Sequence, residues 1–398
     1  MFNARLDELN DYPFQRLADL LAPISPRANV PPIVMSVGDP RHQPPAFAAE
    51  IIARASDRWN EYPPLAGTPE FRAAAAGWLE RRYKLKPGTI DRDTQVTPVA
   101  GTREGLFQAA LLAVSHGEGR ASRPVALMPN PCYQIYFGAA VMAGAEPRFM
   151  AASKDTGFVP DLEALPGDLL ARSEIMYLCN PGNPQGACAP LDHLKRAIEL
   201  AREHDFLLVV DECYAEIYSG DAPPVGGIEA AATLGGGLDN LLLFHSLSKR
   251  SSAAGMRSGF AVGSPRTIER FNRLRSFACA ATPRPVLEAA AALWNDDAHA
   301  ALTRARYRAK IDAAERVLGA RYGFYRPRGG FFLWLDVGDG ERAAKKLWAE
   351  AAIRALPGAY LTKPDARGIN SGAPYIRVAL VDEVDVVEAG LSRLAQVL

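Results

Sequence analysis

The stretch LLLFHSLSKRSSAAGMR, residues 241–257, joins an uninterrupted apolar run to a loop that is rich in hydroxyls and contains a single lysine, Lys249. Four consecutive apolar residues are typical of a strand that is buried on both faces of a sheet. In open α/β sheets, ligands bind beyond the carboxyl ends of the strands. The stretch therefore predicts a buried sheet with a ligand site at its edge.

Runs of the same apolar character recur along the chain and alternate with helical patterns. The strand-like runs are residues 124–128, 174–179, 206–210 and 259–263, and the clearest helical patterns are residues 103–114, 191–204 and 266–277. Strands that are apolar on both faces and separated by helices indicate a mostly parallel sheet with helices on each side. The predicted fold class is therefore α/β.

The pattern changes near residue 283 to long helices with two strand-like runs, residues 331–337 and 375–380. Residues 283–398 are therefore predicted to form a smaller α+β domain, and residues 45–282 a large ligand-binding domain. Residues 1–44 are rich in proline and have no core of their own, so we expect them to pack on the smaller domain.

The composition narrows the choice of partners and compartment. The 45 basic residues balance the 45 acidic ones, so we expect no nucleic-acid or membrane-surface partner, and no metal. The five cysteines include no C-x-x-C pair and the amino end has no apolar run, which together indicate a cytoplasmic protein with free thiols. Pro129, Asn130 and Pro131 interrupt the uncharged run 124–145, which predicts a strand, a turn and a helix there and no membrane span.

Polar residues follow several predicted strands. Asp211 directly follows one strand, Asn183 lies in the NPGNPQG motif after another, and Lys249 follows a third. Each has an ordinary alternative, as a cap, a turn residue or a solvated lysine. Together they match the needs of pyridoxal phosphate chemistry, a lysine amine that forms a Schiff base and a carboxylate beside the pyridine nitrogen. The sequence therefore predicts pyridoxal 5'-phosphate as the cofactor.

A phosphate group also needs cations, hydroxyls and free backbone N–H groups, which the first turn of a helix provides. Gly101, Thr102 and Arg103 open the predicted helix 103–114, and Ser246, Ser248 and Arg257 flank the lysine. We expect these two groups of residues to converge on one phosphate.

Seven motifs occur in a fixed order along the chain: EYPPLAG, AGTREGLF, NPCYQIY, NPGNPQG, VVDECYAEIY, SLSKRSSAAGMRSG and YIRVAL. In this order the chain resembles the fold-type I pyridoxal-phosphate aminotransferases of the aspartate aminotransferase superfamily, over nearly its whole length. The resemblance implies a homodimer with shared active sites that acts on small amino acids and 2-oxoacids. Gln185 stands where the family motif N-P-x-N-P-T-G has threonine, so the local turn geometry is expected to differ.

The resemblance also implies a role for each motif residue. Lys249, Asp211 and Tyr214 form the catalytic set, in which Lys249 joins the cofactor and carries the proton while Asp211 pairs with the ring nitrogen. The resemblance implies that Tyr214 and Asn183 donate hydrogen bonds to the ring oxygen and that Tyr133 stacks on the ring. The residues implied for phosphate binding are Gly101, Thr102, Arg103, Ser246, Ser248, Arg257 and the neighbouring subunit's Tyr62. Those implied for substrate binding are Gly38, Asn183, Arg377 and Arg41.

A narrower resemblance concerns the substrate. Segments such as YPFQRLADLLAP, PPIVMSVGDPRHQPPAF and LPGAYLTKPDARGINSGAPYIRVAL look like the succinyldiaminopimelate aminotransferases of lysine biosynthesis. Such enzymes move an amino group between glutamate and N-succinyl-2-amino-6-oxopimelate. The alternatives are a broad-specificity aspartate or aromatic aminotransferase, a β-lyase or decarboxylase of the same fold, and a non-enzymatic regulator.

Both proposed substrates carry carboxylates beyond the one that Arg377 would clamp. Arg41, Arg103 and Arg250 are the arginines nearest to the motifs, and we expect Arg41, at a position where that branch has lysine, to bind a distal carboxylate. His245 is expected to be a supporting or core histidine, and Cys132 and Cys213 are expected to point away from the site.

Overall fold

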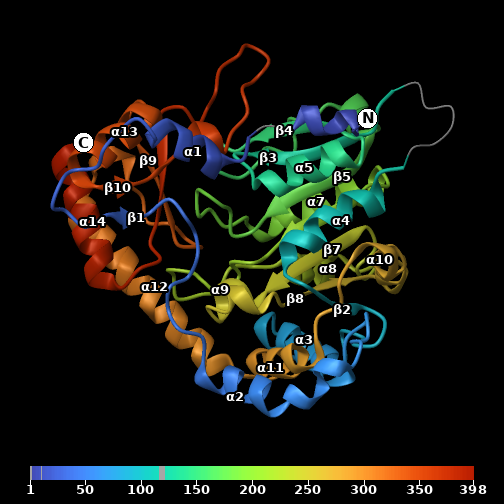
Figure 1. Ribbon diagram of the computed structural model, residues 1–398. Helices are drawn as coiled ribbons and strands as arrows, with labels where there is room; N and C mark the ends of the chain where they lie inside the picture. Colours follow the sequence, from blue (N-terminus) through green and yellow to red (C-terminus); the bar gives the residue numbers. More distant parts are fainter. Residues whose placement is uncertain (1, 10, 116–121) are drawn as a thin grey trace.

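The computed structural model describes residues 2–9, 11–115 and 122–398, and its largest element is a seven-stranded sheet (Figure 1). The strands run in the order β2-β8-β7-β6-β5-β3-β4, and all are parallel except β8, which is antiparallel to both of its neighbours. The strand bounds are β2 (Val96–Val99), β3 (Val125–Asn130), β4 (Glu146–Ala151), β5 (Ser173–Cys179), β6 (Leu207–Asp211), β7 (Leu241–Ser246) and β8 (Gly259–Gly263). The predicted α/β class with a mostly parallel sheet is confirmed.

Successive side chains of each central strand enter two different cores, which is why these strands are apolar throughout. In β7, Leu241 and Leu243 join one hydrophobic cluster, whereas Leu242 and Phe244 join the other. Side chains of a strand alternate between its two faces, and each large apolar side chain buried in this way contributes about 1.5–3 kcal/mol. Both faces are thus covered, and polar groups are left at the strand ends.

Helices supply the other half of each core. One face packs against α4 (Thr102–Ala113), α5 (Gln134–Met142) and α10 (Pro265–Ala278), and the other against α3 (Pro69–Arg82), α7 (Leu191–Glu203), α8 (Gly227–Leu234) and α11 (Arg284–Asn295). Capping residues mark where several helices begin. Thr68 accepts a hydrogen bond from the N–H of Phe71 (3.2 Å) before α3, a contact that contributes about 1 kcal/mol.

A smaller part of the molecule contains a three-stranded antiparallel sheet of order β11-β12-β9 and a parallel pair, β1 with β10. Its elements are β1 (Ile33–Val34), β9 (Phe332–Asp336), β10 (Ile353–Arg354), β11 (Leu356–Pro357), β12 (Tyr375–Ala379), α12 (Asp297–Leu318), α13 (Gly340–Ala351) and α14 (Val384–Val397). The long helix α12 runs from the region of α11 to this part (Figure 1). The amino-terminal segment reaches the small part through β1.

The position of α11 differs from the expected division of the chain at residue 283. Its apolar side chains, including Leu293 and Trp294, share a core with α3 and the large sheet. Asp296 then caps α12 by accepting hydrogen bonds from the N–H groups of Ala298 (2.8 Å) and His299 (3.4 Å). We therefore propose that the boundary lies at Asp296, between α11 and α12.

In the described residues, no helix is both long enough and apolar enough to cross a membrane. The run 124–145 folds as the strand β3, a turn and the helix α5. The remaining short helices are α1 (Pro13–Leu21), α2 (Ala46–Arg54), α6 (Gly167–Leu170) and α9 (Leu247–Arg250).

Candidate active site

A cavity of about 380 Å³ opens at the carboxyl ends of the parallel strands, where the large sheet meets the small part. Asp211 at the end of β6 and Ser246 at the end of β7 form part of its wall, and Lys249 follows in α9. Phe332 of β9 and Arg377 of β12 close it from the small part. The cavity therefore lies where the sheet topology predicts a ligand site.

Lys249 projects its amine into this cavity. The Nζ atom donates a hydrogen bond to the carbonyl oxygen of Gly38, and the ring of Phe331 lies with its centroid 5.5 Å from Nζ. Burial lowers the pKa of the amine to about 8 because a charged ammonium is poorly solvated there. A substantial fraction of the amine is therefore neutral and nucleophilic at mildly alkaline pH.

Asp211 is a buried carboxyl held in a fixed orientation. Its Oδ2 accepts a hydrogen bond from Tyr136 Oη (2.8 Å), and its Oδ1 accepts one from the N–H of Cys213 (3.1 Å). Burial raises its pKa, although these hydrogen bonds and the Lys249 charge act in the opposite direction. A cation beside this carboxyl would offset the cost of its burial.

Gly101 and Arg257 make a narrow cradle at the amino end of α4. Gly101 has a φ of +84°, and a Cβ at this position would lie 2.0 Å from Nη2 of Arg257. Only glycine therefore lets the guanidinium lie against the backbone. Thr102 and Ser248 line the same side of the cavity, where Ser246 Oγ and Ser248 Oγ are 2.9 Å apart. The arrangement places hydroxyls, a cation and helix N–H groups together, as an anion requires.

Tyr133, Tyr214 and Asn183 line the middle of the cavity. The Tyr133 hydroxyl accepts a hydrogen bond from Arg103 Nε at 2.9 Å, and Tyr214 packs with its ring centroid 5.4 Å from that of Phe331. Burial raises the pKa of both tyrosines, so their hydroxyls stay protonated and can donate hydrogen bonds.

Arg377 is a buried cation with one hydrogen-bond donor, Nε, that has no partner among the described residues. Its Nη2 donates to the Ser36 carbonyl (2.7 Å) and its Nη1 donates to Asn183 Oδ1 (3.2 Å). The buried Nε has no hydrogen-bond partner among the described residues, and burial lowers the guanidinium pKa to about 10. A buried cation with an unpaired donor is suited to bind a carboxylate.

Three of the predicted site residues do not line the cavity: Gly101, which lies against the lining residue Arg257, and Arg41 and Tyr62, which lie away from it. The Arg41 side chain is 53% exposed and pairs with Asp382, Nε to Oδ1, at 3.3 Å. Tyr62 is 99% exposed. Arg41 already pairs with a carboxylate of the protein, Asp382, in the segment after β12. This geometry therefore gives no support to the expected contact between Arg41 and a distal carboxylate of the substrate.

Several cavity residues were not predicted from the sequence. Tyr12 and Phe14 come from the start of α1, and Asp39 lies at the mouth. Cys132 and Cys213 line the cavity as well, although we expected both to point away, and Cys213 Sγ lies 2.9 Å from Thr102 Oγ1. Cys213 lies inside the motif VVDECYAEIY and Tyr12 opens the segment YPFQRLADLLAP, so proximity to predicted site residues in the sequence was the available signal.

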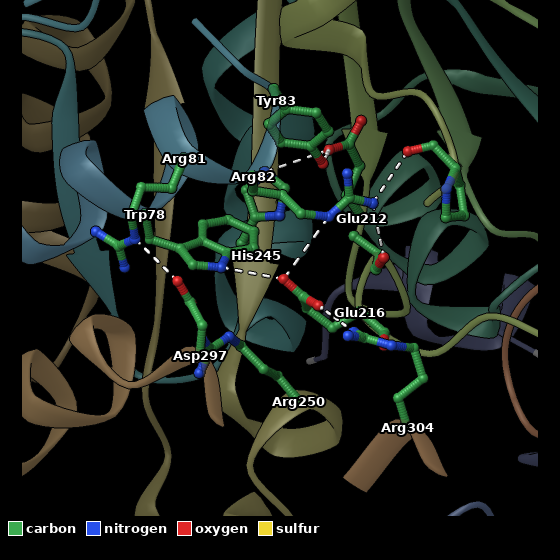
Figure 2. A network of polar contacts seen from close by, with 12 residues as sticks. Trp78, Arg81, Arg82, Tyr83, Glu212, Glu216, His245, Arg250, Asp297 and Arg304 are labelled. Atoms are coloured by element: carbon green, nitrogen blue, oxygen red, sulfur yellow. Dashed lines mark hydrogen bonds and ion pairs between the residues drawn. The ribbon is translucent and has the colours of Figure 1, made fainter. Parts of the chain in front are cut away.

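Behind the cavity, a polar network ties the segments that carry Asp211 and Lys249 to α12 (Figure 2). Glu216 accepts hydrogen bonds from Trp78 Nε1 (3.1 Å) and Arg304 Nη1 (2.9 Å). Arg250, next to Lys249, donates from Nη2 to Asp297 Oδ1 at 2.8 Å. Asp297 and Arg304, in the first part of α12, are thus fixed to the chain segments that follow Lys249 and Asp211.

His245 belongs to this inner network and not to the cavity wall (Figure 2). Its Nε2 lies 3.3 Å from Glu212 Oε2, and its ring packs 4.9 Å from Trp78 and 5.2 Å from Phe260. Burial lowers its pKa to about 3, so the imidazole is neutral. The packing is that of a core histidine.

The residues of this site fit pyridoxal phosphate. Lys249 offers a partly neutral amine, Asp211 offers a buried carboxyl that a protonated ring nitrogen would complement, and the Gly101–Arg257 cradle offers a place for phosphate. Among the described residues, no three His, Cys, Asp or Glu side chains gather closely enough to hold a metal ion. Fold and site together define a pyridoxal-phosphate-dependent enzyme of fold type I.

The chain belongs to the aminotransferase class I and II family, whose model matches residues 30–389 and whose members use pyridoxal phosphate. It is 31% identical to an LL-diaminopimelate aminotransferase of Dehalococcoides mccartyi, over 98% of this chain and 97% of that one. It is 32% identical to the 4-dedimethylamino-4-oxo-anhydrotetracycline transaminase OxyQ of Streptomyces rimosus, over 97% and 99% of the two chains. A solved aminotransferase of Neisseria meningitidis Z2491 superposes with a TM-score of 0.94 at 34% identity, covering 99% of each chain.

Proposed function

We propose that this aminotransferase transfers an amino group from a diaminopimelate to 2-oxoglutarate, with the corresponding oxo acid and glutamate as products, and catalyses the reverse reaction as well. The observation that carries the proposal is the pairing of two cations in one cavity, Arg377 at its base and Arg103 beside its mouth, at positions suited to the two carboxylates of such substrates.

The residues divide the work of transamination between them. Pyridoxal phosphate supplies a carbonyl that condenses with amines and a ring that accepts the electrons left behind when a proton leaves carbon. Lys249 Nζ would take the proton from the substrate α-carbon and pass it to the bound cofactor. Asp211 would hold the proton on the ring nitrogen, and the Gly101–Arg257 cradle would hold the phosphate.

Arg377 and Arg103 orient the substrate. The unpaired Nε of Arg377 is free to take one oxygen of the α-carboxylate, which fixes the α-carbon near Lys249. Arg103 reaches the mouth, where its Nε donates to Tyr133 and its Nη2 donates to Tyr12 at 3.3 Å. Asp39 also lines the mouth, and although burial acts in the opposite direction, Tyr133, Tyr12 and Asp39 together raise the pKa of Arg103.

This pair of opposite charges favours a zwitterionic distal end over a succinylated one. Free diaminopimelate has an ammonium and a carboxylate at its far end, which Asp39 and Arg103 complement. N-succinylation removes the ammonium and adds a carboxylate, which Asp39 would repel. The names of the diaminopimelate aminotransferase relatives support the same choice, although the equally similar tetracycline transaminase shows that identity alone does not decide the substrate.

The experiment is a panel of amino donors with 2-oxoglutarate, followed as glutamate formation by the purified holoenzyme. LL-diaminopimelate is expected to have the highest kcat/KM, followed by its N-succinyl derivative. Faster turnover of aspartate or aromatic donors would identify a broad-specificity enzyme instead. Release of pyruvate and ammonia without glutamate would identify a β-lyase.

Arg103→Met and Arg41→Met form a matched pair for the distal carboxylate. Loss of a charge-assisted hydrogen bond costs about 1.5–3 kcal/mol, so Arg103→Met should lower kcat/KM for diaminopimelate roughly ten- to a hundredfold. Alanine, which has no distal group, should be affected much less. Arg41→Met should leave both donors within about twofold, because an exposed ion pair contributes little. Equal losses with both donors in Arg103→Met would show that Arg103 acts only through Tyr133.

A further inference from the structure

Residues 35–42, which we call the strap, cross the cavity between the two parts of the molecule. Four contacts bind the strap to β12 and to the residues that follow β12. The contacts are the N–H of Ala379 to the Met35 carbonyl (2.7 Å), Arg377 Nη2 to the Ser36 carbonyl (2.7 Å), Arg41 Nε to Asp382 Oδ1 (3.3 Å) and His42 Nδ1 to Glu383 Oε1 (3.1 Å). The strap is therefore held at both ends, with Val37, Gly38 and Asp39 spanning the cavity between them.

The middle of the strap touches the reactive lysine. The Gly38 carbonyl accepts the hydrogen bond of Lys249 Nζ, and the Asp39 charge partly opposes the burial that lowers the pKa of the Lys249 amine. A Cβ at Gly38 would lie 2.5 Å from Cζ of Phe332, so the strap passes close over the aromatic floor. Any movement of the strap therefore changes the surroundings of the lysine.

His42 is the buried fastener of the strap, with a side chain only 3% exposed. Its Nε2 lies 2.8 Å from Lys310 Nζ, which also donates to the Val381 carbonyl at 3.1 Å. A lysine ammonium has donors and no acceptor, so Nε2 must carry the lone pair and Nδ1 the hydrogen. The chain of hydrogen bonds thus runs from Lys310 through a neutral imidazole to the Glu383 carboxylate.

We propose that His42 is a positioning residue: the hydrogen-bond chain from Lys310 through His42 to Glu383 holds the strap in place and thereby sets Gly38 and Asp39 beside Lys249. When His42 Nε2 is protonated, it can no longer accept the hydrogen bond from Lys310, and two cations are then in contact. The strap is therefore released by acid. The inference concerns the strap itself and rests on the proposed function only in taking Lys249 as the reactive lysine.

The sign of the pH effect follows from the groups around His42. The titratable and charged groups that face the His42–Lys310 pair are Arg306, Tyr307 and Lys310 of α12, Asp382 and Glu383 before α14, and Arg41 of the strap. Burial, followed by the Lys310 charge, lowers the pKa of His42 below its ordinary 6.5. His42 therefore takes up a proton less readily in the fastened strap than in the released one. The strap is held above about pH 6.5 and loosens as the pH falls below that value.

Alkaline pH has no matching effect. Burial lowers the pKa of Lys310 to about 8, but a neutral amine still carries N–H groups that can donate to His42 Nε2. The device is therefore one-sided, which distinguishes it from the general loss of structure at both extremes of pH.

The test is amide hydrogen exchange of the strap in the holoenzyme at pH 5.5 and 7.5, corrected for the intrinsic pH dependence of exchange. The β12 peptide serves as the internal reference. In the wild type the strap should exchange faster at pH 5.5 than at pH 7.5 after correction, by up to about tenfold, the limit set by one pH unit below the pKa of a free imidazole. His42→Gln keeps an acceptor and a donor but does not titrate, so it should exchange equally at both pH values.

Arg41→Gln is the matched control, because it removes the neighbouring ion pair with Asp382 and leaves the hydrogen-bond chain from Lys310 through His42 to Glu383 intact, so it should keep the pH response. If His42→Gln does not fold, Lys310→Met replaces it, since a protonated His42 without a cation beside it can stay bonded to Glu383 and the response should vanish. Equal corrected exchange in the wild type at both pH values, or a full pH response in the His42 or Lys310 variant used, overturns the proposal. Since no substrate is present, these outcomes are independent of the proposed reaction.

Discussion

Asp211 is buried at a place where water cannot stabilise its charge, and hydrogen bonds from Tyr136 and the N–H of Cys213, together with the Lys249 charge, support it instead. Asp211→Asn keeps the shape of the side chain but removes the negative charge. Loss of such preorganised electrostatic support should lower kcat about a hundredfold or more while most of the bound cofactor remains. The measurement is kcat beside the cofactor content of the purified variant, and unchanged kcat would assign the ring proton to another acid.

Lys249 combines two tasks, joining the cofactor and moving the α-proton. Lys249→Ala should therefore lower transamination about ten-thousandfold, since general acid–base catalysis alone contributes up to about that factor. The phosphate cradle does not involve this side chain, so the variant should still bind cofactor noncovalently. Single-turnover absorbance with glutamate measures both properties, and a variant that kept a tenth of the wild-type rate would refute the assignment.

The residues at strand ends could be predicted because the pattern that makes a buried strand also locates its end. Asp211 and Lys249 follow β6 and β7 directly, and the cavity brings them together. Tyr12, Phe14 and Asp39 could not be found in this way, because they reach the cavity only through the packing of the amino-terminal segment. Whether a cation such as Arg41 is free or paired likewise depends on a residue more than 300 positions away, Asp382.

Among the elements, the two edge strands of the large sheet show what a sequence pattern misses. β2 and β4 were not predicted, and each contains a proline, Pro98 and Pro147 respectively. Proline removes a backbone donor and is tolerated in a sheet mainly at its edges, where one side of the strand needs no partner. The central strands, apolar on both faces, gave the stronger signal.

The start of α12 offers a test of the inner network at the scale of an element. Arg250 is 2% exposed and donates to the Leu293 carbonyl (2.6 Å) as well as to Asp297. Arg250→Met should lower the free energy of unfolding by about 2–4 kcal/mol, because buried carbonyls lose their donor. It should also lower kcat, since α9 carries Lys249.

Arg81→Met is the control, because Arg81 pairs with the other oxygen of Asp297 (Nε to Oδ2, 2.9 Å) on the exposed side and donates from Nη2 to the Trp294 carbonyl (2.9 Å). It should cost less than Arg250→Met, about 1–2 kcal/mol for an exposed ion pair and one hydrogen bond, and leave kcat unchanged. Urea denaturation and steady-state kinetics of both variants provide the comparison. Equal losses in the two would mean that the carboxylate of Asp297, and not Arg250, holds the start of α12.

At the scale of the whole molecule, we propose a homodimer in which Tyr62 serves the phosphate site of the partner. Tyr62 is 99% exposed in the single chain, and Trp59 nearby in sequence is 54% exposed, a pattern that suits an interface. Tyr62→Ala should weaken cofactor binding about tenfold, the loss expected for one hydrogen bond to a charged group.

Mixing Tyr62→Ala chains with Lys249→Ala chains tests the shared site directly. A mixed dimer would contain one site with both an intact Lys249 and an intact partner tyrosine, so activity at limiting cofactor should rise above that of either variant alone. If Tyr62 served the site of its own chain, no such site would form and mixing would restore nothing. Sedimentation velocity establishes the mass of the assembly.

The close approach of Arg257 to Gly101 also bears on the history of the family. A side chain at position 101 would occupy the space of the guanidinium, 2.0 Å from Nη2, so replacement of the glycine would displace the arginine from this place. Descendants that have replaced the glycine should therefore also show changes at position 257. In newly read genomes, that coupled signature would separate working members of the lineage from inactive ones before any of them is purified.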